Sequence, residues 1–166
     1  MRTLLLFSTL ALSAFAQPAS PPAETAVAVN GKNIRITYSS PSMRGRQIFG
    51  GLVPYDKVWR AGANAATTLT TDAALMIGDL AVPAGKYTLY ILPTAESWTL
   101  IVNKQTGQWG TEYSQGQDLG RVKMKVSTVG SPVERWQMLL TPPSGNKTNL
   151  QLTWEKTQAT IPITVK

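Results

Sequence analysis

The chain has 166 residues, a length typical of one domain, and its 16 Lys and Arg against nine Asp and Glu give a formal net charge of +7. It contains neither His nor Cys. These two absences exclude disulfides, cysteine nucleophiles, iron–sulfur clusters, His-ligated zinc and every mechanism that requires an imidazole. With 43% hydrophobic residues the chain can bury a core, so disorder throughout is not expected.

The N-terminal segment has the pattern of a secretory signal peptide. Arg2 precedes an apolar run from Leu4 to Phe15, and Ala14-Phe15-Ala16 has the small residues that signal peptidase recognises. The run is shorter than the roughly 20 residues that span a bilayer as a helix, which favours a removed signal over a permanent anchor. We therefore expect residues 1–16 to be cleaved off, leaving a periplasmic or secreted protein with no membrane anchor.

The next residues predict a leader followed by a hairpin. Residues 17–25 carry three prolines among small residues and predict a flexible leader, with ordered structure from Ala26. Apolar residues then alternate with polar ones on both sides of Asn30-Gly31, a pair whose tolerance of positive φ suits a tight hairpin turn.

The segment Ser39–Asn64 follows no regular period, because prolines and glycines interrupt it repeatedly. It nevertheless contains large apolar residues such as Phe49 and Trp59. Loops of this length without secondary structure are usually functional or disordered, and this one is too apolar for disorder. It predicts a long, ordered, well-packed loop, which is the first place to look for function.

Strand patterns return at short intervals after this loop. They fall at residues 67–71, 74–77, 80–82, 87–92, 98–102, 121–126, 136–140, 150–154 and 161–165, with turns expected at 142–146 and at Lys156-Thr157. No window of ten or more residues shows a helical period. The chain is therefore expected to be all-β, a single antiparallel β-sandwich of about nine strands over residues 26–166. Pro162 lacks an N–H, which places the last strand toward a sheet edge.

Three cations alternate with apolar residues along one predicted strand. Arg121, Lys123 and Lys125 would share its outer face. They could bind an anionic polymer, but lysines on the solvent face of a strand also prevent edge-to-edge association. The net charge is modest and no stacking aromatics alternate with the cations, so no nucleic-acid partner is expected.

The long loop concentrates guanidinium groups. Arg44, Arg46 and Arg60 lie in a glycine-rich context close to Asn64. Arginine is suited to holding carboxylates, phosphates or sulfated sugars through paired hydrogen bonds. The same side chains could instead bind backbone carbonyls and fix an irregular loop, or point into water, with Arg60 the best candidate for a buried, bonded arginine.

The five tryptophans divide between core and surface. Trp98, Trp136 and Trp154 occupy inward positions of predicted strands and are expected in the core. Trp109 belongs to a polar loop that begins at Asn103 and Lys104. Its indole could stack on a sugar ring or cap the end of the sheet.

Catalytic motifs are scarce. The nine carboxylates are scattered mainly in predicted turns; two of them could form a glycosidase pair, but sequence cannot supply the separation that such a pair requires. No calcium loop, nucleophile elbow, Walker motif or dinucleotide fingerprint is present. The glycosylation pattern Asn146-Lys147-Thr148 is frequent by chance. No catalytic residue, metal or cofactor is assigned.

Several runs resemble one bacterial family. They are Arg44–Tyr55, Val58–Asn64 with Thr67-Thr68, Pro83–Leu89, Asn103-Lys104 and Gln108–Gly110. Together they resemble the family catalogued as domain of unknown function 2911 (DUF 2911), over about Asn30 to Val165. The resemblance implies an exported, mostly β protein of bacteria with a double-membrane envelope, and it implies no activity. Gly107–Thr111 departs from the usual pattern, in which relatives continue with Ala-Tyr.

The sequence leads to one main hypothesis and two alternatives. The main hypothesis is a non-enzymatic binding module for a small anionic or carbohydrate ligand. The alternatives are a carboxylate-dependent carbohydrate-active enzyme and an envelope protein-interaction module; the oligomeric state is open. The expected ligand-binding residues are Arg44, Arg46, Trp59, Arg60, Asn64, Asn103, Lys104 and Trp109.

Overall fold

The structure, a computed structural model, describes residues 19–166, so the predicted signal peptide and its cleavage site lie outside the described residues. Nine strands and one 3-10 turn make up this part of the chain: β1 (Pro22–Val29), β2 (Lys32–Ser39), β3 (Thr68–Thr71), β4 (Leu75–Ile77), β5 (Leu80–Val82), β6 (Gly85–Pro93), β7 (Trp98–Asn103), η1 (Gln115–Gln117), β8 (Asp118–Leu140) and β9 (Lys147–Val165). Every strand pairing is antiparallel. The all-β, antiparallel prediction is confirmed.

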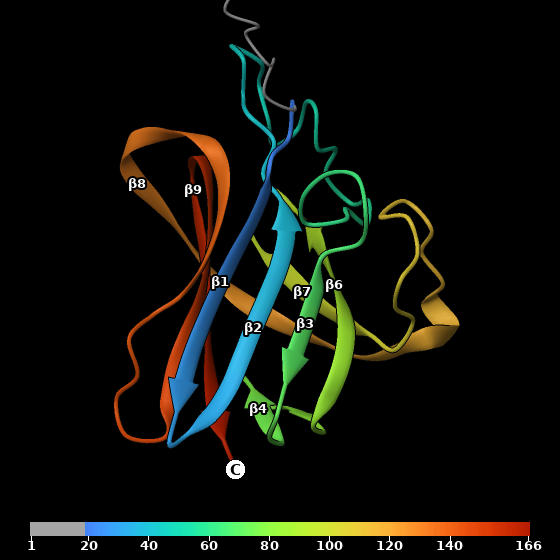
Figure 1. The fold of residues 1–166 in the computed structure, drawn as a ribbon. Helices are drawn as coiled ribbons and strands as arrows, with labels where there is room; N and C mark the ends of the chain where they lie inside the picture. The colour runs from blue at the N-terminus through green and yellow to red at the C-terminus, as the bar shows by residue number, and fades with distance from the viewer. Residues whose placement is uncertain (1–18) are drawn as a thin grey trace, which may run out of the picture.

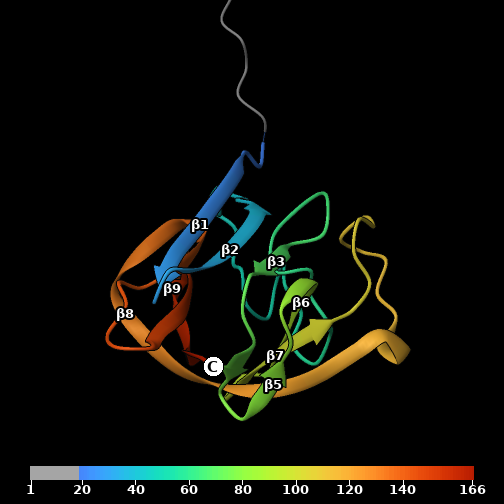
Figure 2. The same ribbon diagram turned by 60° about the horizontal axis from the view of Figure 1, so that its bottom comes forward.

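The nine strands form one sheet that curls around its own core. Its hydrogen-bonded order is β1-β2-β3-β6-β7-β8-β9-β4-β5. The long β8 pairs with β7 from Asp118 to Met124 and with β9 from Lys125 to Leu140, so it passes from one side of the molecule to the other (Figures 1 and 2). A bridge from Ser42 to Arg135 then joins the chain after β2 to the far part of β8. This arrangement is compatible with the expected sandwich, although all nine strands belong to one hydrogen-bonded sheet and not to two separate sheets.

The expected hairpin at Asn30-Gly31 is present, but its first strand begins early. Asn30 and Gly31 have φ values of 51° and 75°, the two positive angles of a type I′ turn, and connect β1 to β2. Pro22 already pairs with Ser39. Residues 22–25 are therefore part of a strand, and the expected leader boundary at Ala26 was four residues too late.

The sequence predicted a break between residues 126 and 136 and a turn at Lys156-Thr157, and the structure has irregularities within the long strands β8 and β9 at these places. The predicted strands 121–126 and 136–140 belong to β8, whose register shifts between Thr128 and Gln137. The turn predicted at Lys156-Thr157 is wrong, because Thr157 pairs with Thr128 inside β9. The chain bulges one residue earlier, at Glu155, where φ is 53°.

The last strand does not lie at a sheet edge. β9 pairs with β8 as far as Thr160 and with β4 from Ile163 onward. Pro162 falls in the gap between the two ladders, and its carbonyl accepts the Gly78 N–H. The edge prediction is wrong because a proline can be accommodated where one pairing ends and the next begins.

The long loop between β2 and β3 fills one end of the core. Its Ile48, Phe49 and Val53 are buried with the inward residues of the strands. An aromatic cluster lies there, made of Phe49, Trp59, Trp98, Trp136 and Trp154, with ring centroids 4.6–6.4 Å apart between neighbours. The tryptophans predicted for the core, at 98, 136 and 154, are 2%, 0% and 1% exposed, which confirms that prediction.

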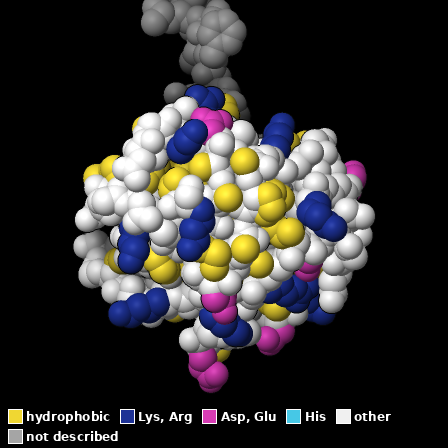
Figure 3. Space-filling view, turned by 90° about the horizontal axis from the view of Figure 1, so that it is seen from below, with side chains coloured by type: hydrophobic (Ala, Val, Ile, Leu, Met, Phe, Trp, Pro, Cys, Tyr) yellow, Lys and Arg dark blue, Asp and Glu magenta, His cyan; other side chains and the backbone are white. Residues whose placement is uncertain are grey.

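The opposite end of the molecule is built differently. It carries the β1–β2 turn and the short β4–β5 hairpin, and its surface has hydrophobic side chains in the middle with Lys and Arg around them (Figure 3). Within residues 19–166, no helix has the length and apolar character needed to cross a membrane.

Candidate functional site

A cavity of about 450 Å³ opens at the end of the sheet where β1 begins; we call it the rim cavity. It is lined by Ala19, Ser20, Pro41, Ser42, Arg44, Arg46, Leu52, Val58, Trp59, Arg60, Gly62, Ala63, Tyr90, Gly110, Thr111, Tyr113 and Trp154. The lining comes from the segment before β1, the β2–β3 loop, β6, the β7–β8 loop and β9. Three arginines that the sequence singled out, at 44, 46 and 60, therefore share one cavity.

A tight turn presents Arg44 and Arg46. Arg44 has φ 49° and is followed by Gly45 with φ 71°, and the Arg46 N–H donates to the Met43 carbonyl at 3.0 Å. Glu134 of β8 anchors this turn, since its carbonyl accepts the Met43 N–H and its side chain accepts the Arg44 N–H at 2.9 Å. The turn is thus tied to the sheet through its backbone, which leaves its side chains available.

The guanidinium groups of this turn differ in how far they are occupied. Arg46 donates from Nε to the Met43 carbonyl at 2.9 Å and from Nη2 to the Ser42 carbonyl at 2.7 Å. Arg44 makes one long contact, from Nη2 to the Ala19 carbonyl at 3.5 Å. Because a guanidinium has five N–H donors, both groups keep donors for a ligand, Arg44 most of all.

Arg60 follows Trp59, which extends the sheet along β6 beyond the first residue of β3. The backbone of Trp59 exchanges hydrogen bonds with Ile91 of β6, at 2.7 and 2.8 Å. The half-buried Arg60 donates from Nε to the Gly62 carbonyl at 3.2 Å and keeps both Nη groups free of partners in the described part of the chain. Loop fixing, one of the sequence alternatives for these arginines, is thus observed for Arg46 and Arg60, while each guanidinium keeps further N–H groups without a partner among the described residues.

Four aromatic residues form another part of the wall. Trp59 stacks on Trp154 at 5.8 Å with planes 19° apart, and the Trp154 indole N–H donates to the Glu134 carbonyl at 3.0 Å. Tyr90 and Tyr113 meet edge to face at 4.9 Å. Both sets of rings are held by their neighbours, so this wall is preformed.

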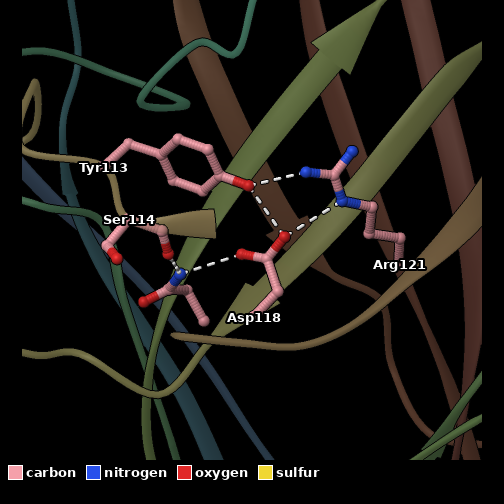
Figure 4. A network of polar contacts seen from close by, with 5 residues as sticks. Tyr113, Ser114, Asp118 and Arg121 are labelled. Carbon is pink, nitrogen blue, oxygen red and sulfur yellow. Dashed lines mark hydrogen bonds and ion pairs between the residues drawn. The ribbon is translucent and has the colours of Figure 1, made fainter. Parts of the chain in front are cut away.

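A polar network fixes Tyr113 and the loop that carries it (Figure 4). The Tyr113 hydroxyl donates to Asp118 Oδ2 and accepts from Arg121 Nη2, both at 2.7 Å, and Arg121 Nε donates to the same carboxylate oxygen at 3.0 Å. Asn103 Nδ2 donates to Asp118 Oδ1 and to the Ser114 carbonyl, each at 2.9 Å.

The network shifts the pKa values of Tyr113 and Arg121. Burial, and then the hydrogen bond to Asp118, raise the pKa of Tyr113 above its usual value. The pKa of Arg121 is also raised, because its hydrogen bonds to Asp118 and Tyr113 outweigh the opposing effect of burial. Tyr113 therefore stays a neutral hydroxyl at physiological pH, and the network gives the cavity wall no additional charge.

The structure separates the other predicted ligand-binding residues from the cavity lining. Asn103 is 1% exposed and its amide is occupied in the network. Lys104 is exposed after β7, and Trp109 is 52% exposed on the β7–β8 loop. Asn64 is exposed, with its carbonyl bound to the Gly110 N–H at 2.9 Å. Trp59 joins the three arginines in the lining.

Sequence reasoning missed several lining residues. Tyr90 belongs to the predicted strand 87–92, and nothing in the pattern showed that the β7–β8 loop would cover one face of that strand with Gly110, Thr111 and Tyr113. The alternation of β6 was the available signal, because an aromatic residue on an outer face requires a cover. Ala19, which precedes β1, was not anticipated either.

The charge of the rim cavity is one-sided. Among residues 19–166, its lining contains three arginines and no Asp, Glu, Asn or Gln. In the described part of the chain the ion pairs join Arg35 to Glu24 and Arg121 to Asp118, so no cavity arginine has a carboxylate partner there. No group of three potential metal ligands occurs among residues 19–166.

Other sequence features lie away from this cavity. Arg121, Lys123 and Lys125 are exposed on β8 as expected, and Arg121 is held by Asp118. Asn146, the possible glycosylation acceptor, donates from Nδ2 to the Val165 carbonyl at 3.1 Å.

The fold and the rim cavity define a small antiparallel β protein with an arginine-lined, aromatic-walled cavity at one end of a curled sheet. Residues 20–163 match the model of a protein family described as protein of unknown function (DUF2911). The chain belongs to this family, as its motifs indicated. No curated protein and no solved structure matches the chain.

Proposed function

We propose that this protein is a non-enzymatic binding module and that a small anionic ligand occupies the rim cavity. The observation that carries the proposal is the convergence of Arg44, Arg46 and Arg60 on one cavity whose lining has no carboxylate. Like charges brought together repel one another, and a bound anion relieves that repulsion. Of the two ligand classes expected from the sequence, the anionic one is supported.

The donors in the cavity suit such a ligand. Charge-assisted hydrogen bonds from guanidinium to carboxylate, phosphate or sulfate are shorter and stronger than neutral ones, and arginine can make them in pairs. The hydrogen bonds from Arg46 and Arg60 to backbone carbonyls hold the two side chains in place before binding. Preorganised donors lose less conformational entropy when the ligand binds.

The carbohydrate-active enzyme is not favoured by this geometry. Its mechanism needs two carboxyl groups flanking a bond in a cleft. The rim cavity has no Asp or Glu in its lining, and the nearby Glu134 already accepts the Arg44 N–H on the anchored turn. Selective binding therefore fits these residues better than bond cleavage.

Calorimetric titration with inorganic phosphate, sulfate and citrate, at constant ionic strength, tests the proposal. Saturable binding of at least one of them is expected. Arg44→Gln should weaken it about tenfold or more, because a hydrogen bond to a charged group contributes about 1.5–3 kcal/mol. This variant is chosen because Arg44 has only one long intramolecular side-chain contact in the described part of the chain, so the fold should tolerate the change.

Lys123→Gln on β8 is the matched control, since it removes one positive charge from an exposed position outside the cavity lining. It should leave the affinity within about twofold of the original protein. The proposal is wrong if none of the three anions binds, or if both variants weaken binding equally, since equal losses indicate attraction by net charge alone.

A further inference from the structure

The rim cavity combines two kinds of wall. Guanidinium groups belong to one kind, and the rings of Trp59, Tyr90, Tyr113 and Trp154 to the other, with Leu52 and Val58 adding aliphatic surface. A small inorganic anion would satisfy the arginines and leave the partly exposed rings of Trp59 and Tyr113 against water, whereas Tyr90 and Trp154 lie almost fully buried behind them. A ligand that uses both walls must itself have a charged end and an apolar part.

Hydrogen-bond capacity decides between an apolar ring and a sugar. Each hydroxyl of a sugar has a proton to donate as well as lone pairs to accept, and arginine offers donors only. The strongest side-chain acceptors for such protons are Asp, Glu, Asn and Gln, and none of these belongs to the described lining, whose hydroxyls come from Ser20, Ser42, Thr111 and the two tyrosines.

The cavity hydroxyls offer little compensation. The Tyr90 hydroxyl already accepts from Gln108 Nε2 at 3.0 Å and the Tyr113 hydroxyl accepts from Arg121 Nη2 at 2.7 Å, so the few Ser and Thr hydroxyls are the main acceptors that remain. A buried polyhydroxylated ligand would have several protons without acceptors, which costs free energy for each one. Oxygens of a carboxylate, phosphate or sulfate only accept, so they match the arginines without this cost.

The aromatic wall is also rigid in the way that ring binding requires. The Tyr113 hydroxyl is held at two atoms by Asp118 and Arg121, and Trp59 packs against Trp136 at 4.6 Å and Trp154 at 5.8 Å. A flat ring can stack on such surfaces without ordering them first. The volume of about 450 Å³ lies within the range usual for small-molecule sites, roughly 300–1,000 Å³.

We infer that the rim cavity takes an aromatic anion: a flat apolar ring bearing a carboxylate, phosphate or sulfate group, with the anion on Arg44, Arg46 and Arg60 and the ring against the tyrosine and tryptophan wall. This inference rests on the proposed function and names the ligand class for the same site. It excludes a polyhydroxylated ring as the preferred body of the ligand.

Four probes separate the contributions of ring and charge. Phenyl phosphate has both, inorganic phosphate has the anion alone, glucose 6-phosphate has the anion on a hydroxylated ring, and benzyl alcohol has the ring alone. In competition calorimetry, the Kd of phenyl phosphate should be at least about tenfold lower than that of each other probe. Inorganic phosphate and glucose 6-phosphate lack the stacking of an apolar ring, and benzyl alcohol lacks the charge interaction.

A pair of variants tests the ring wall directly. Tyr113→Leu removes the ring, and Tyr113→Phe keeps it while losing the hydroxyl; the Arg121–Asp118 ion pair can persist in both. The leucine variant should reduce the preference for phenyl phosphate over inorganic phosphate about threefold or more, and the phenylalanine variant should retain it.

The failure of this inference differs from the failure of the proposed function. If inorganic phosphate or glucose 6-phosphate binds as tightly as phenyl phosphate, the inference is overturned and the anion-binding module stands. If none of the phosphates binds, the proposed function fails as well. An unchanged preference in the leucine variant, confirmed as folded by circular dichroism, would place the ring elsewhere and contradict the assigned wall.

Discussion

Trp136 and Trp154 are neighbours in the aromatic cluster, both almost fully buried, but their indole nitrogens differ. Trp154 Nε1 donates to the Glu134 carbonyl at 3.0 Å, whereas Trp136 Nε1 has no partner among the described residues. A buried N–H without a partner retains its full desolvation cost, about 1–3 kcal/mol, and a satisfied one contributes about 1 kcal/mol.

The two tryptophans should therefore respond differently to the same substitution. Trp154→Phe loses a hydrogen bond and Trp136→Phe removes an unsatisfied donor, while both lose a similar ring volume. We expect Trp154→Phe to be the less stable variant by about 2 kcal/mol in the free energy of unfolding. Urea denaturation of the two variants measures this difference directly, and an equal loss, or a larger loss for Trp136→Phe, would contradict the assignment.

At the same scale, the type and position of each side chain decided what the sequence could predict. The clustering of Arg44, Arg46 and Arg60 within 17 positions of sequence suggested a shared ligand cradle but left loop fixing open, and only the fold shows that all three line one cavity. Asparagine is ambiguous, because its amide can serve a ligand or the backbone equally well. The amide of Asn103 serves the polar network, a role that depends on Asp118 and Ser114 being brought close by folding.

Among the elements, the β2–β3 and β7–β8 loops meet at a glycine. A Cβ atom placed on Gly110 would lie 2.7 Å from Arg60 Cδ and 2.7 Å from the Asn64 carbonyl oxygen. Real Cβ contacts are longer, so Gly110→Ala must push the loops apart and displace Arg60 from its position in the rim cavity.

Gly110→Ala should lower the free energy of unfolding by about 1–3 kcal/mol, the usual cost of overpacking, and weaken anion binding as well. Gly116→Ala, in the same loop, is the matched control: nothing lies within 4 Å of its added Cβ, and its effect should stay within about 0.5 kcal/mol. Chemical denaturation and phosphate titration of both variants provide the comparison. Two alanine variants of equal stability would show that the loops do not meet as described.

The strands illustrate where sequence patterns lose information. The Asn30-Gly31 turn was predictable because two successive positive φ angles need such residues. The pattern around Lys156-Thr157 was misleading, since polar residues that interrupt an apolar alternation mark a bulge as well as a turn. Pairing of Thr157 with Thr128 depends on how β8 itself bends, and no local window contains that information.

For the molecule as a whole, the curled sheet explains why one end carries the cavity. Curling brings the chain after β2 against β8, where Ser42 bridges Arg135 and Glu134 anchors the arginine turn. Other rings of the aromatic cluster pack against Trp59 on the core side of the long loop. The long loop is therefore fixed by the sheet on one side and the core on the other, which gives an irregular segment the rigidity that selective binding requires.

The response of this whole fold to alkaline pH follows from its buried tyrosines. Burial raises the pKa values of Tyr87, Tyr90 and Tyr113 above the ordinary value of 10.0. A raised pKa means that folding favours the neutral hydroxyl, while the unfolded chain releases the proton at lower pH. The stabilisation is thus fully present below pH 10 and is lost as the pH rises through the folded-state values.

We therefore expect the free energy of unfolding to fall progressively above about pH 10. Urea denaturation between pH 8 and pH 11.5 measures it, and tyrosinate absorbance should show these residues ionising at higher pH in the folded than in the unfolded protein. Tyr87→Phe should make the decline shallower, because that position no longer has a proton whose release distinguishes the two states. An unfolding free energy that is constant or rising over this interval would contradict the burial of the tyrosine hydroxyls, and with it the fixed aromatic wall to which Tyr90 and Tyr113 belong.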